Sequence, residues 1–364
     1  MGKKTINALV KKIVSNRSCN MKNKFDKFNE IDRGEYGKVY KACINDACKN
    51  KIAVKKSDTN LSAEYLISKR IANMKVPFTH GYVKCPTDDF MLMEYLSGNT
   101  LKNVLNKLGK DSIKSIVIQV LYILYSIHNK YPSFRHHDLH LANIMIMRKR
   151  NDVEREITIN DKKITFNEAK VEVKLMDFGL ATMMGTINPV VTKSKKFKSD
   201  FGIYSKSDSM YDVHLFLNSL WTSMKKNGRS ETIQFINDIL PKTYLGEESE
   251  HIKEYRLRSD VQHTLPTYED IFKHPYFHKN KKNSVMTILN QIKQVPKAKS
   301  FVIKKKVPVN QNEAKTKAMI VLKKNAENKN KKFKKPTLKK KLPSLTKTNA
   351  KPLNIHVPKK NNSY

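Results

Sequence analysis

Two short polar motifs, each joined to an apolar strand, constrain this chain more than any other feature. The first, HHDLHLAN at 136–143, lies between an apolar run with helical spacing and the short strand Ile144–Ile146. The second is Asp177-Phe178-Gly179, at the end of a later apolar strand. Either motif alone is also typical of a turn rich in polar residues. Together they bring two carboxylates and a carboxamide beside strands, and such oxygen donors suit a hard cation and a reacting hydroxyl.

An aspartate followed five residues later by an asparagine, and then by an apolar strand ending in Asp-Phe-Gly, resembles the catalytic segment of the protein kinase superfamily. Phosphoryl transfer needs little covalent help, so positioning and charge neutralisation are the tasks left to the side chains. The resemblance implies that Asp138 orients the substrate hydroxyl and accepts its proton. It also implies that Asn143 and Asp177 hold Mg²⁺ against the phosphates of ATP.

Residues 31–40 resemble the glycine-rich loop of kinases, whose pattern is GxGxxGxV. The residues that this resemblance assigns to the nucleotide site are Ile31, Gly34, Gly37 and Val39. Glycine lets backbone N–H groups close over the phosphates, while the valine covers the base. Asp32 stands where the first glycine belongs, and its charge would weaken the binding of a polyphosphate. The stretch alone is also typical of a plain β-hairpin turn.

The strand KIAVK at 51–55 resembles the kinase motif that ends in a phosphate-binding lysine. The resemblance implies that Lys55 pairs the α- and β-phosphates and is held by a helix glutamate. Glu64 is the candidate, because it lies in a run at 62–71 with apolar residues at helical spacing. Nine residues separate the two, fewer than kinases usually have, but an extended connection spans roughly 30 Å. A plain surface glutamate is the alternative.

Residues 90–101 resemble the strand that leads from the N-terminal lobe of a kinase into its hinge. The resemblance implies that adenine hydrogen-bonds the backbone between Glu94 and Leu96, behind Met93 as gatekeeper. The run 112–129 then predicts a long amphipathic helix that leads into the catalytic segment.

Three departures from the kinase pattern lie near the catalytic aspartate. His137 replaces the arginine that usually receives the phosphate of an activation loop, which argues against that style of switching. His140 replaces the lysine that usually touches the transferred phosphate, although an imidazole can still donate one hydrogen bond to it. Histidine at this place also occurs in aminoglycoside-type and haspin-like kinases, so it does not identify the substrate class. No Ala-Pro-Glu anchor follows, but Asp212 is predicted to hydrogen-bond the catalytic-loop backbone from a central helix.

The resemblance covers about residues 27–278 and predicts an α+β, bilobal protein-kinase-like fold. We expect an antiparallel β N-lobe at 27–96 and a mainly helical C-lobe at 97–278. The N-terminal extension, 1–26, is either a short amphipathic helix or disordered. Alternating isoleucines at 148–170, where the chain is longer than kinases need, predict an extra β-hairpin on the surface.

Residues 279–364 predict a disordered basic tail. They hold 25 lysines, no arginine and two acidic residues, in a chain whose net charge is +38. So few apolar residues cannot offset the entropy lost on ordering. The tail is either a solvated segment or one that attracts nucleic acid or acidic proteins without sequence specificity. Lys329–Lys341 would also serve as a nuclear-import signal.

The cysteines and the apolar runs predict the compartment. Cys19, Cys43, Cys48 and Cys85 lack CxxC spacing and a matching histidine cluster, so we expect free thiols in a reducing compartment. The chain has no run of 18 apolar residues and no secretory signal, so we expect no contact with a membrane. These features predict an intracellular protein.

The motifs together predict a serine/threonine protein kinase that uses ATP and Mg²⁺ and acts on protein substrates. Leu180 after the Asp-Phe-Gly favours serine and threonine over tyrosine. The short Lys55–Glu64 spacing and the lysine- and asparagine-rich composition resemble divergent kinases of large DNA viruses, which act in the host cytoplasm, the virion or the nucleus. Two alternatives stay open, a pseudokinase scaffold that binds through its tail and a small-molecule phosphotransferase. The sequence gives no oligomeric state.

Overall fold

The computed structural model describes residues 2–278, except 36, 45–46, 194–207, 226–229 and 259. Contacts divide the chain into two units, Met1–Lys293 and Gln294–Tyr364, and every described residue lies in the first. The predicted disordered tail, 279–364, lies outside the described residues.

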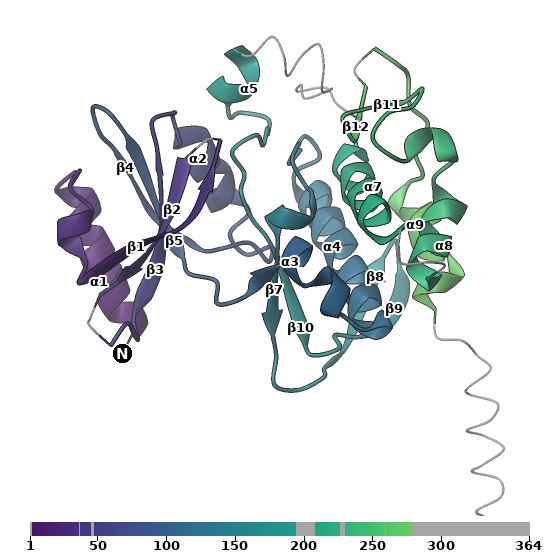
Figure 1. Ribbon diagram of the computed structural model, residues 1–364, viewed down its shortest axis with the longest axis horizontal. Helices are drawn as coiled ribbons and strands as arrows, with labels where there is room; N and C mark the ends of the chain where they lie inside the picture. The colour runs from purple at the N-terminus through teal and green to yellow at the C-terminus, as the bar shows by residue number, and fades with distance from the viewer. Residues whose placement is uncertain are drawn as a thin grey trace, which may run out of the picture. The chain divides into compact units, whose positions relative to one another are not determined.

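The N-lobe is a five-stranded antiparallel sheet, as predicted (Figure 1). In the order β1-β2-β3-β5-β4, its strands are Lys27–Gly34, Gly37–Cys43, Lys51–Ser57, Asp89–Glu94 and Thr79–Lys84. The tight turn between β1 and β2 requires glycine at Gly37, where φ is +142° and an added Cβ would lie 2.4 Å from the Lys56 carbonyl oxygen. Helix α2 (Ser62–Arg70) follows β3 and packs against β4.

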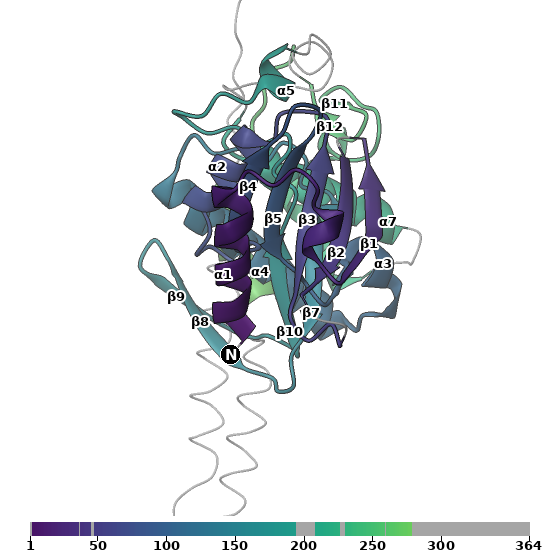
Figure 2. The ribbon, with the colours of Figure 1, turned by 90° about the vertical axis from the view of Figure 1, so that its left-hand side faces the viewer.

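Helix α1 (Gly2–Ser15) lies across the N-lobe sheet beside β4, in front of the sheet in Figure 2. Val10 and Ile13 are buried and pack into the apolar core of that sheet. At Gly81 an added Cβ would lie 2.7 Å from a methyl carbon of Val14, so the helix and the strand are in close contact. Of the two alternatives for the N-terminal extension, the ordered helix is therefore correct.

The expectation of free thiols is wrong, because all four cysteines are paired. Cys19 pairs with Cys85 and Cys43 pairs with Cys48, with Cα atoms 5.8 Å and 4.8 Å apart. The segment that follows α1 returns to the end of β4, and this brings Cys19 to Cys85 across 66 residues. Such a meeting depends on tertiary packing, so the cysteine spacing does not reveal it.

The C-lobe is mainly helical, as predicted, and is built around the long helix α4 (Lys110–Lys130). Its other helices are α3 (Leu101–Val104), α5 (Pro189–Lys193), α7 (Tyr211–Met224), α8 (Glu231–Ile239) and α9 (Tyr268–Lys273). Buried side chains from α2 to the end of the described C-lobe form one apolar core, which includes most of the inward face of α4. This core fixes α4 and α7, which hold the site.

Two short strands of the C-lobe bring the two polar motifs together. Strand β7 (Ile144–Arg148) begins directly after Asn143, and β10 (Val171–Leu175) ends just before Asp177. The strands pair antiparallel, with Ile144 opposite Leu175, beside the short β6 (Asn99–Thr100). Antiparallel pairing in this register places the start of one strand next to the end of the other.

The insertion forms the predicted β-hairpin, of β8 (Glu154–Ile159) and β9 (Lys162–Asn167). The prediction that it lies on the surface needs correction. Its alternating apolar residues are buried in the C-lobe core, and β9 packs against α4. These residues are Ile157, Ile159, Ile164 and Phe166. One face of the hairpin is thus part of the core, as the period of two in the sequence allows.

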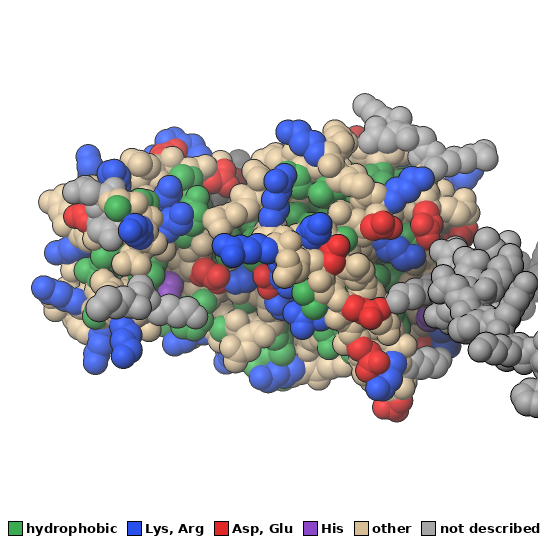
Figure 3. Space-filling view, turned by 90° about the horizontal axis from the view of Figure 1, so that it is seen from below, with side chains coloured by type: hydrophobic (Ala, Val, Ile, Leu, Met, Phe, Trp, Pro, Cys, Tyr) green, Lys and Arg blue, Asp and Glu red, His purple; other side chains and the backbone are tan. Residues whose placement is uncertain are grey.

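A last small hairpin lies beyond α8, in the part of the C-lobe next to α7 (Figure 1). It consists of β11 (Ile252–Lys253) and β12 (Arg256–Leu257). Lysine and arginine side chains are spread over the face of the molecule seen in Figure 3, with acidic side chains among them. Within the described residues no helix is long and apolar enough to span a bilayer.

Candidate active site

Lys55, Glu64 and Asp177 form a connected charge cluster. Lys55 Nζ lies 3.0 and 2.9 Å from the two Glu64 carboxylate oxygens and 2.8 Å from Asp177 Oδ1. The Lys55 and Glu64 side chains are only 7% and 4% exposed. The predicted ion pair is therefore present, and the nine-residue separation is enough to bring α2 over β3.

Burial and charge act in opposite directions within this cluster. Burial alone would lower the pKa of Lys55, but the carboxylates of Asp177 and Glu64 more than offset it and raise that pKa. Burial raises the pKa of Glu64, and the Lys55 charge opposes this. Burial would also raise the pKa of Asp177, yet Lys55 and the Gly179 N–H, 3.2 Å away, keep it low. Lys55 is thus a permanent cation between two carboxyl groups.

The glycine-rich turn lies next to this cluster in the sheet. Val39 of β2 is paired with Lys55 of β3, so the residue predicted to cover the base is in register with the predicted phosphate ligand. Gly34 and Gly37 face each other at the turn. Ile31 lies at an irregularity of β1, and its side chain is exposed.

The predicted hinge segment is tied to its neighbours through Glu94. The Glu94 N–H donates to the Phe78 carbonyl at 2.7 Å, while the Glu94 carboxylate accepts from the Phe78 N–H at 3.0 Å. Lys174 of β10 donates to the same carboxylate at 2.6 Å. Of the backbone groups predicted to bind adenine, the Glu94 N–H is already used. Leu96 is half-buried just beyond the end of β5.

Three predicted catalytic-loop residues meet around the Asp138 carboxylate. Asn143 Nδ2 donates to the Asp138 carbonyl at 2.8 Å and to Asp138 Oδ2 at 3.0 Å. His140 Nε2 lies 3.5 Å from the same Oδ2. The Ala142 N–H donates to His140 Nδ1 at 3.2 Å, so a neutral His140 carries its proton on Nε2, towards Asp138. The sequence motif had predicted this grouping.

Asp212 at the start of α7 holds the backbone of the catalytic loop, as predicted. Its carboxylate accepts from the N–H groups of His136 and His137 at 2.7 and 2.8 Å, and its side chain is fully buried. This contact fixes His137, whose φ is +62°. Burial lowers the pKa of His137 to about 4, and His137 Nε2 lies 3.0 Å from Thr182 Oγ1. A neutral group therefore stands where kinases usually carry an arginine.

A cation reaches the catalytic aspartate from β12, and the sequence analysis missed it. Arg256 Nη2 donates to Asp138 Oδ1 at 2.5 Å, and Nη1 donates to the His137 carbonyl. Burial would raise the pKa of Asp138, but the His140 hydrogen bond and the Arg256 charge lower it to about 2. Arg256 lies 118 residues after Asp138 and belongs to no motif, so no sequence signal marked it.

The donor set near Asn143 and Asp177 suits Mg²⁺. The Met176 N–H donates to the Asn143 carbonyl at 3.0 Å, which keeps the two predicted ligands close. Asn143 donates its side-chain N–H groups to Asp138, so its side-chain oxygen can still act as an acceptor. Lys55 contacts Oδ1 of Asp177, so Oδ2 of Asp177 can also act as an acceptor. Among the described residues no cluster of three or more histidine, cysteine or acidic side chains could hold a metal. Mg²⁺ commonly takes few protein ligands and completes its shell with phosphates and water.

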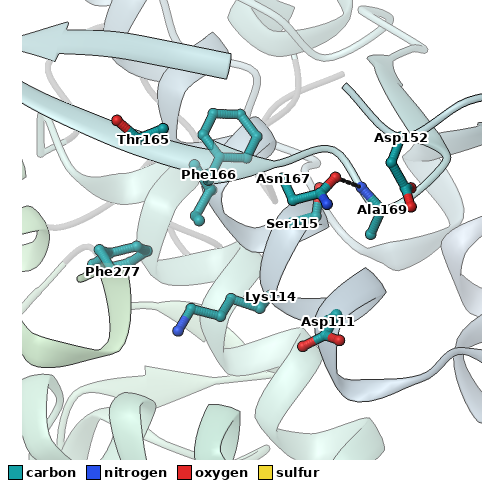
Figure 4. Close-up of a pocket in the computed structure, with 10 residues that line it drawn as sticks. Asp111, Lys114, Ser115, Asp152, Thr165, Phe166, Asn167, Ala169 and Phe277 are labelled. Carbon is teal, nitrogen blue, oxygen red and sulfur yellow. Dashed lines mark hydrogen bonds between the residues drawn. The ribbon is translucent and has the colours of Figure 1, made fainter. Parts of the chain in front are cut away.

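A pocket of about 300 Å³ lies away from these residues, between α4, the β8–β9 hairpin and Phe277 (Figure 4). Lys114 and Asp111 come from α4, whereas Phe166 and Asn167 come from β9. None of the predicted site residues lines it.

Comparisons with known proteins point to the protein kinases. Residues 25–201 match the family model described as "protein kinase domain". A putative serine/threonine-protein kinase of Acanthamoeba polyphaga mimivirus is 24% identical over 212 residues, which are 53% of this chain and 44% of that protein. Human serine/threonine-protein kinase tousled-like 2 is 26% identical over 171 residues, 42% of this chain and 20% of that protein. The chain thus spans less than half the length of either relative.

The solved structures that resemble the chain include the autoinhibited serine kinase domain of the giant muscle protein titin. It is 16% identical, covers 71% of this chain and 82% of its own, and superposes with a TM-score of 0.40. The likeness to kinases of large DNA viruses, predicted from composition and spacing, is confirmed by the mimivirus relative.

Proposed function

Residues 25–201 carry a divergent protein kinase domain, and from this premise we propose that the chain transfers the γ-phosphoryl group of ATP to serine or threonine hydroxyls of proteins. The observation that carries the proposal is the contact of Lys55 with both Glu64 and Asp177. Protein kinases need the strand lysine, the helix glutamate and the Asp-Phe-Gly aspartate assembled at the same time before they can act.

In the proposed reaction Lys55 binds the α- and β-phosphates, and Glu64 keeps its ammonium group in place. The turn at Gly34–Gly37 offers backbone N–H groups to the phosphates, and Val39 with Ile31 covers the base. Backbone groups between Glu94 and Leu96 bind adenine. Mg²⁺, when bound by Asn143 and Asp177, supplies positive charge to the phosphates.

Asp138 orients the substrate hydroxyl and accepts its proton as the new O–P bond forms. A carboxylate with a pKa of about 2 is a weak base, so orientation matters more than proton abstraction before the transition state. His140 has its Nε2 beside the Asp138 carboxylate, where an N–H can donate to the transferred phosphoryl group. To do so, the Nε2–H turns from the Asp138 carboxylate to a phosphoryl oxygen as the transition state forms.

The test is transfer of radiolabelled phosphate from ATP with Mg²⁺ to casein and to a basic protein, using the full chain. We expect Asp138→Asn to lower kcat by about 10²–10⁴-fold, because the hydroxyl loses its acceptor. The matched control is Asp58→Asn, an exposed aspartate at the end of β3, which should leave kcat unchanged. Nucleotide affinity, measured by a thermal shift with ATP and Mg²⁺, should survive in both variants.

Other outcomes would redirect the proposal. Nucleotide binding with no transfer to any protein, but with phosphorylation of an aminoglycoside or a metabolite, would establish a small-molecule phosphotransferase. Absence of both nucleotide binding and transfer in the folded chain would establish a scaffold.

The lysine-rich segment 279–364 lies outside the described residues, and for it we propose a separate role in attracting polyanions. Its 25 lysines are the basis of the proposal. Binding to an unrelated nucleic acid should weaken steeply as salt rises, and deletion of 279–364 should remove that binding. Equal binding before and after the deletion would contradict it.

A further inference from the structure

The proposed mechanism assigns no role to the buried contact between Arg256 and the catalytic loop. The Arg256 side chain is only 17% exposed, and its guanidinium contacts the loop at two places. One nitrogen donates to the carboxylate of Asp138, and another donates to the backbone carbonyl of His137. A planar guanidinium can hold two acceptors in a fixed relative position, which an ammonium group cannot do.

The hairpin that carries Arg256 is itself held firmly. Its turn residues, Glu254 and Tyr255, both have left-handed backbone angles, with φ of +49° and +66°, as a two-residue turn requires. The buried Asn218 of α7 donates to the carbonyls of Gly246 and Tyr255 at 2.8 and 3.0 Å and accepts from the Gly246 N–H at 2.7 Å. All three side-chain hydrogen bonds of Asn218 thus secure this hairpin and the segment that leads to it.

Helix α7 therefore holds both partners of the contact. Asp212, near its start, binds the backbone of the catalytic loop, and Asn218 binds the hairpin. Tyr211 also hydrogen-bonds Arg256, and that contact contributes to a raised pKa of the arginine although burial opposes it. One rigid element fixes the distance between the guanidinium and the carboxylate.

From this arrangement we propose that Arg256 is a positioning residue for phosphoryl transfer, which holds the Asp138 carboxylate in the orientation that receives the substrate hydroxyl. Oδ1 is held by Arg256 and Oδ2 by Asn143, so the plane of the carboxylate is fixed from both sides. Oδ2 is also contacted by His140 Nε2, whereas Oδ1 keeps a second lone pair that can accept from the hydroxyl. The inference rests on the proposed kinase function.

The charged and titratable groups around Asp138 come from four places. His140 and His137 belong to its own loop, Arg256 comes from β12, Tyr211 from α7 and Asp177 from the end of β10. Of these, Arg256 is a permanent cation in direct contact. Its removal should leave Oδ1 of Asp138 without that fixed donor, so that the carboxylate can turn away from the orientation that receives the hydroxyl.

The experiment compares Arg256→Gln, Arg256→Lys and Arg258→Gln in the full chain. Arg258 lies two residues further on, is paired with the exposed Asp260 and does not contact the catalytic loop in the described hydrogen bonds, so it is the matched control. We expect Arg256→Gln to lower kcat about 10–100-fold with an unchanged KM for ATP. Arg258→Gln should match the wild type in both kcat and KM.

Arg256→Lys keeps the positive charge but not the planar guanidinium, so it should restore only part of kcat. It replaces Arg256→Gln if that variant does not fold. An unchanged kcat in Arg256→Gln, or a loss of the same size in Arg258→Gln, would overturn the inference.

Carboxyl ¹³C NMR at a fixed neutral pH separates this inference from the proposed function. If the wild type transfers no phosphate, the proposed function fails, but the carboxyl signal of Asp138 can still be followed in every variant. A change of that signal in Arg256→Gln but not in Arg258→Gln supports the contact. An unchanged signal in Arg256→Gln would overturn it whatever the activity.

Discussion

The two halves of the site are held by different forces. Around Lys55 the groups are charged, and a buried ammonium joins two carboxylates from the two lobes. Around Asp138 the supports are mostly neutral: backbone N–H groups bound to Asp212, a buried His137, and one cation brought from a distant hairpin. Paired charges depend on residue type, so a motif reveals them. Around Asp138 the sequence predicted the contacts of Asp212 and Asn143 but not that of Arg256, which only packing brings from a distant hairpin.

Acid should destabilise the C-lobe, which holds the surroundings of Asp138, more than the cluster around Lys55. Burial lowers the pKa of His128, His137 and His214 to about 4 each. The unfolded chain protonates these imidazoles below about 6.5, while the folded chain does so only near 4. Their contribution to stability is therefore complete above pH 6.5 and is lost as the pH falls towards 4, by about 2–3 kcal/mol per histidine.

Denaturant unfolding followed by Trp221 fluorescence at pH 7.5, 6 and 5 measures this loss, because Trp221 lies on α7 in the same lobe. The midpoint should fall steeply between pH 6 and 5. An unchanged midpoint over this range would mean that the histidines do not contribute as the burial implies.

In the cluster around Lys55, replacement of Lys55 itself should have the largest effect on activity. We expect Lys55→Met to lower kcat/KM by about 10²–10³-fold and to weaken nucleotide binding, because the phosphates lose a fixed donor. Glu64→Gln, which removes one charge and keeps the shape, should have a smaller effect. Equal ATP affinity in Lys55→Met and the wild type, by thermal shift, would show that the cluster serves stability and not the nucleotide.

The two lobes also differ in their covalent links, because both disulfides of the described residues join segments of the N-terminal part of the molecule. Cys19→Ser opens a loop of 66 residues and should cost about 3–4 kcal/mol of stability. Cys48→Ser opens one of five residues and should cost about 2 kcal/mol. Thermal unfolding without reductant gives both values, and a thiol titration of the native chain should find no free cysteine. If the chain is reduced beforehand, neither substitution should change its stability, and the difference between the two variants should disappear.

The smallest expected effect concerns His140. His140→Ala should lower kcat by about tenfold, since one hydrogen bond to the phosphoryl group is lost. His140→Lys, which introduces the residue usual in kinases, should retain most of kcat. The same loss in both variants would indicate that the imidazole acts through Asp138 and Asn143 instead of the phosphate.

Much of the fold could be predicted, because the resemblance to protein kinases implies the two lobes and the ion pair of Lys55 with Glu64. The insertion was recognised as a hairpin, but its burial was not, because a period of two does not say what covers the apolar face. The disulfides and the Arg256 contact were missed. Each joins residues that are far apart in the sequence and carry no common spacing, and only the packed chain brings them together.

Residues of α7 and of the β11–β12 hairpin hold the catalytic loop, and these residues set the length of chain that the site needs. The family model ends at residue 201, yet Asp212, Asn218 and Arg256 all lie beyond that point. A growing chain would therefore contain every kinase motif well before it contained the residues that fix the catalytic loop. During synthesis the loop can reach its final geometry only after β12 has left the ribosome. Before that point the Asp138 carboxylate lacks its contact with Arg256.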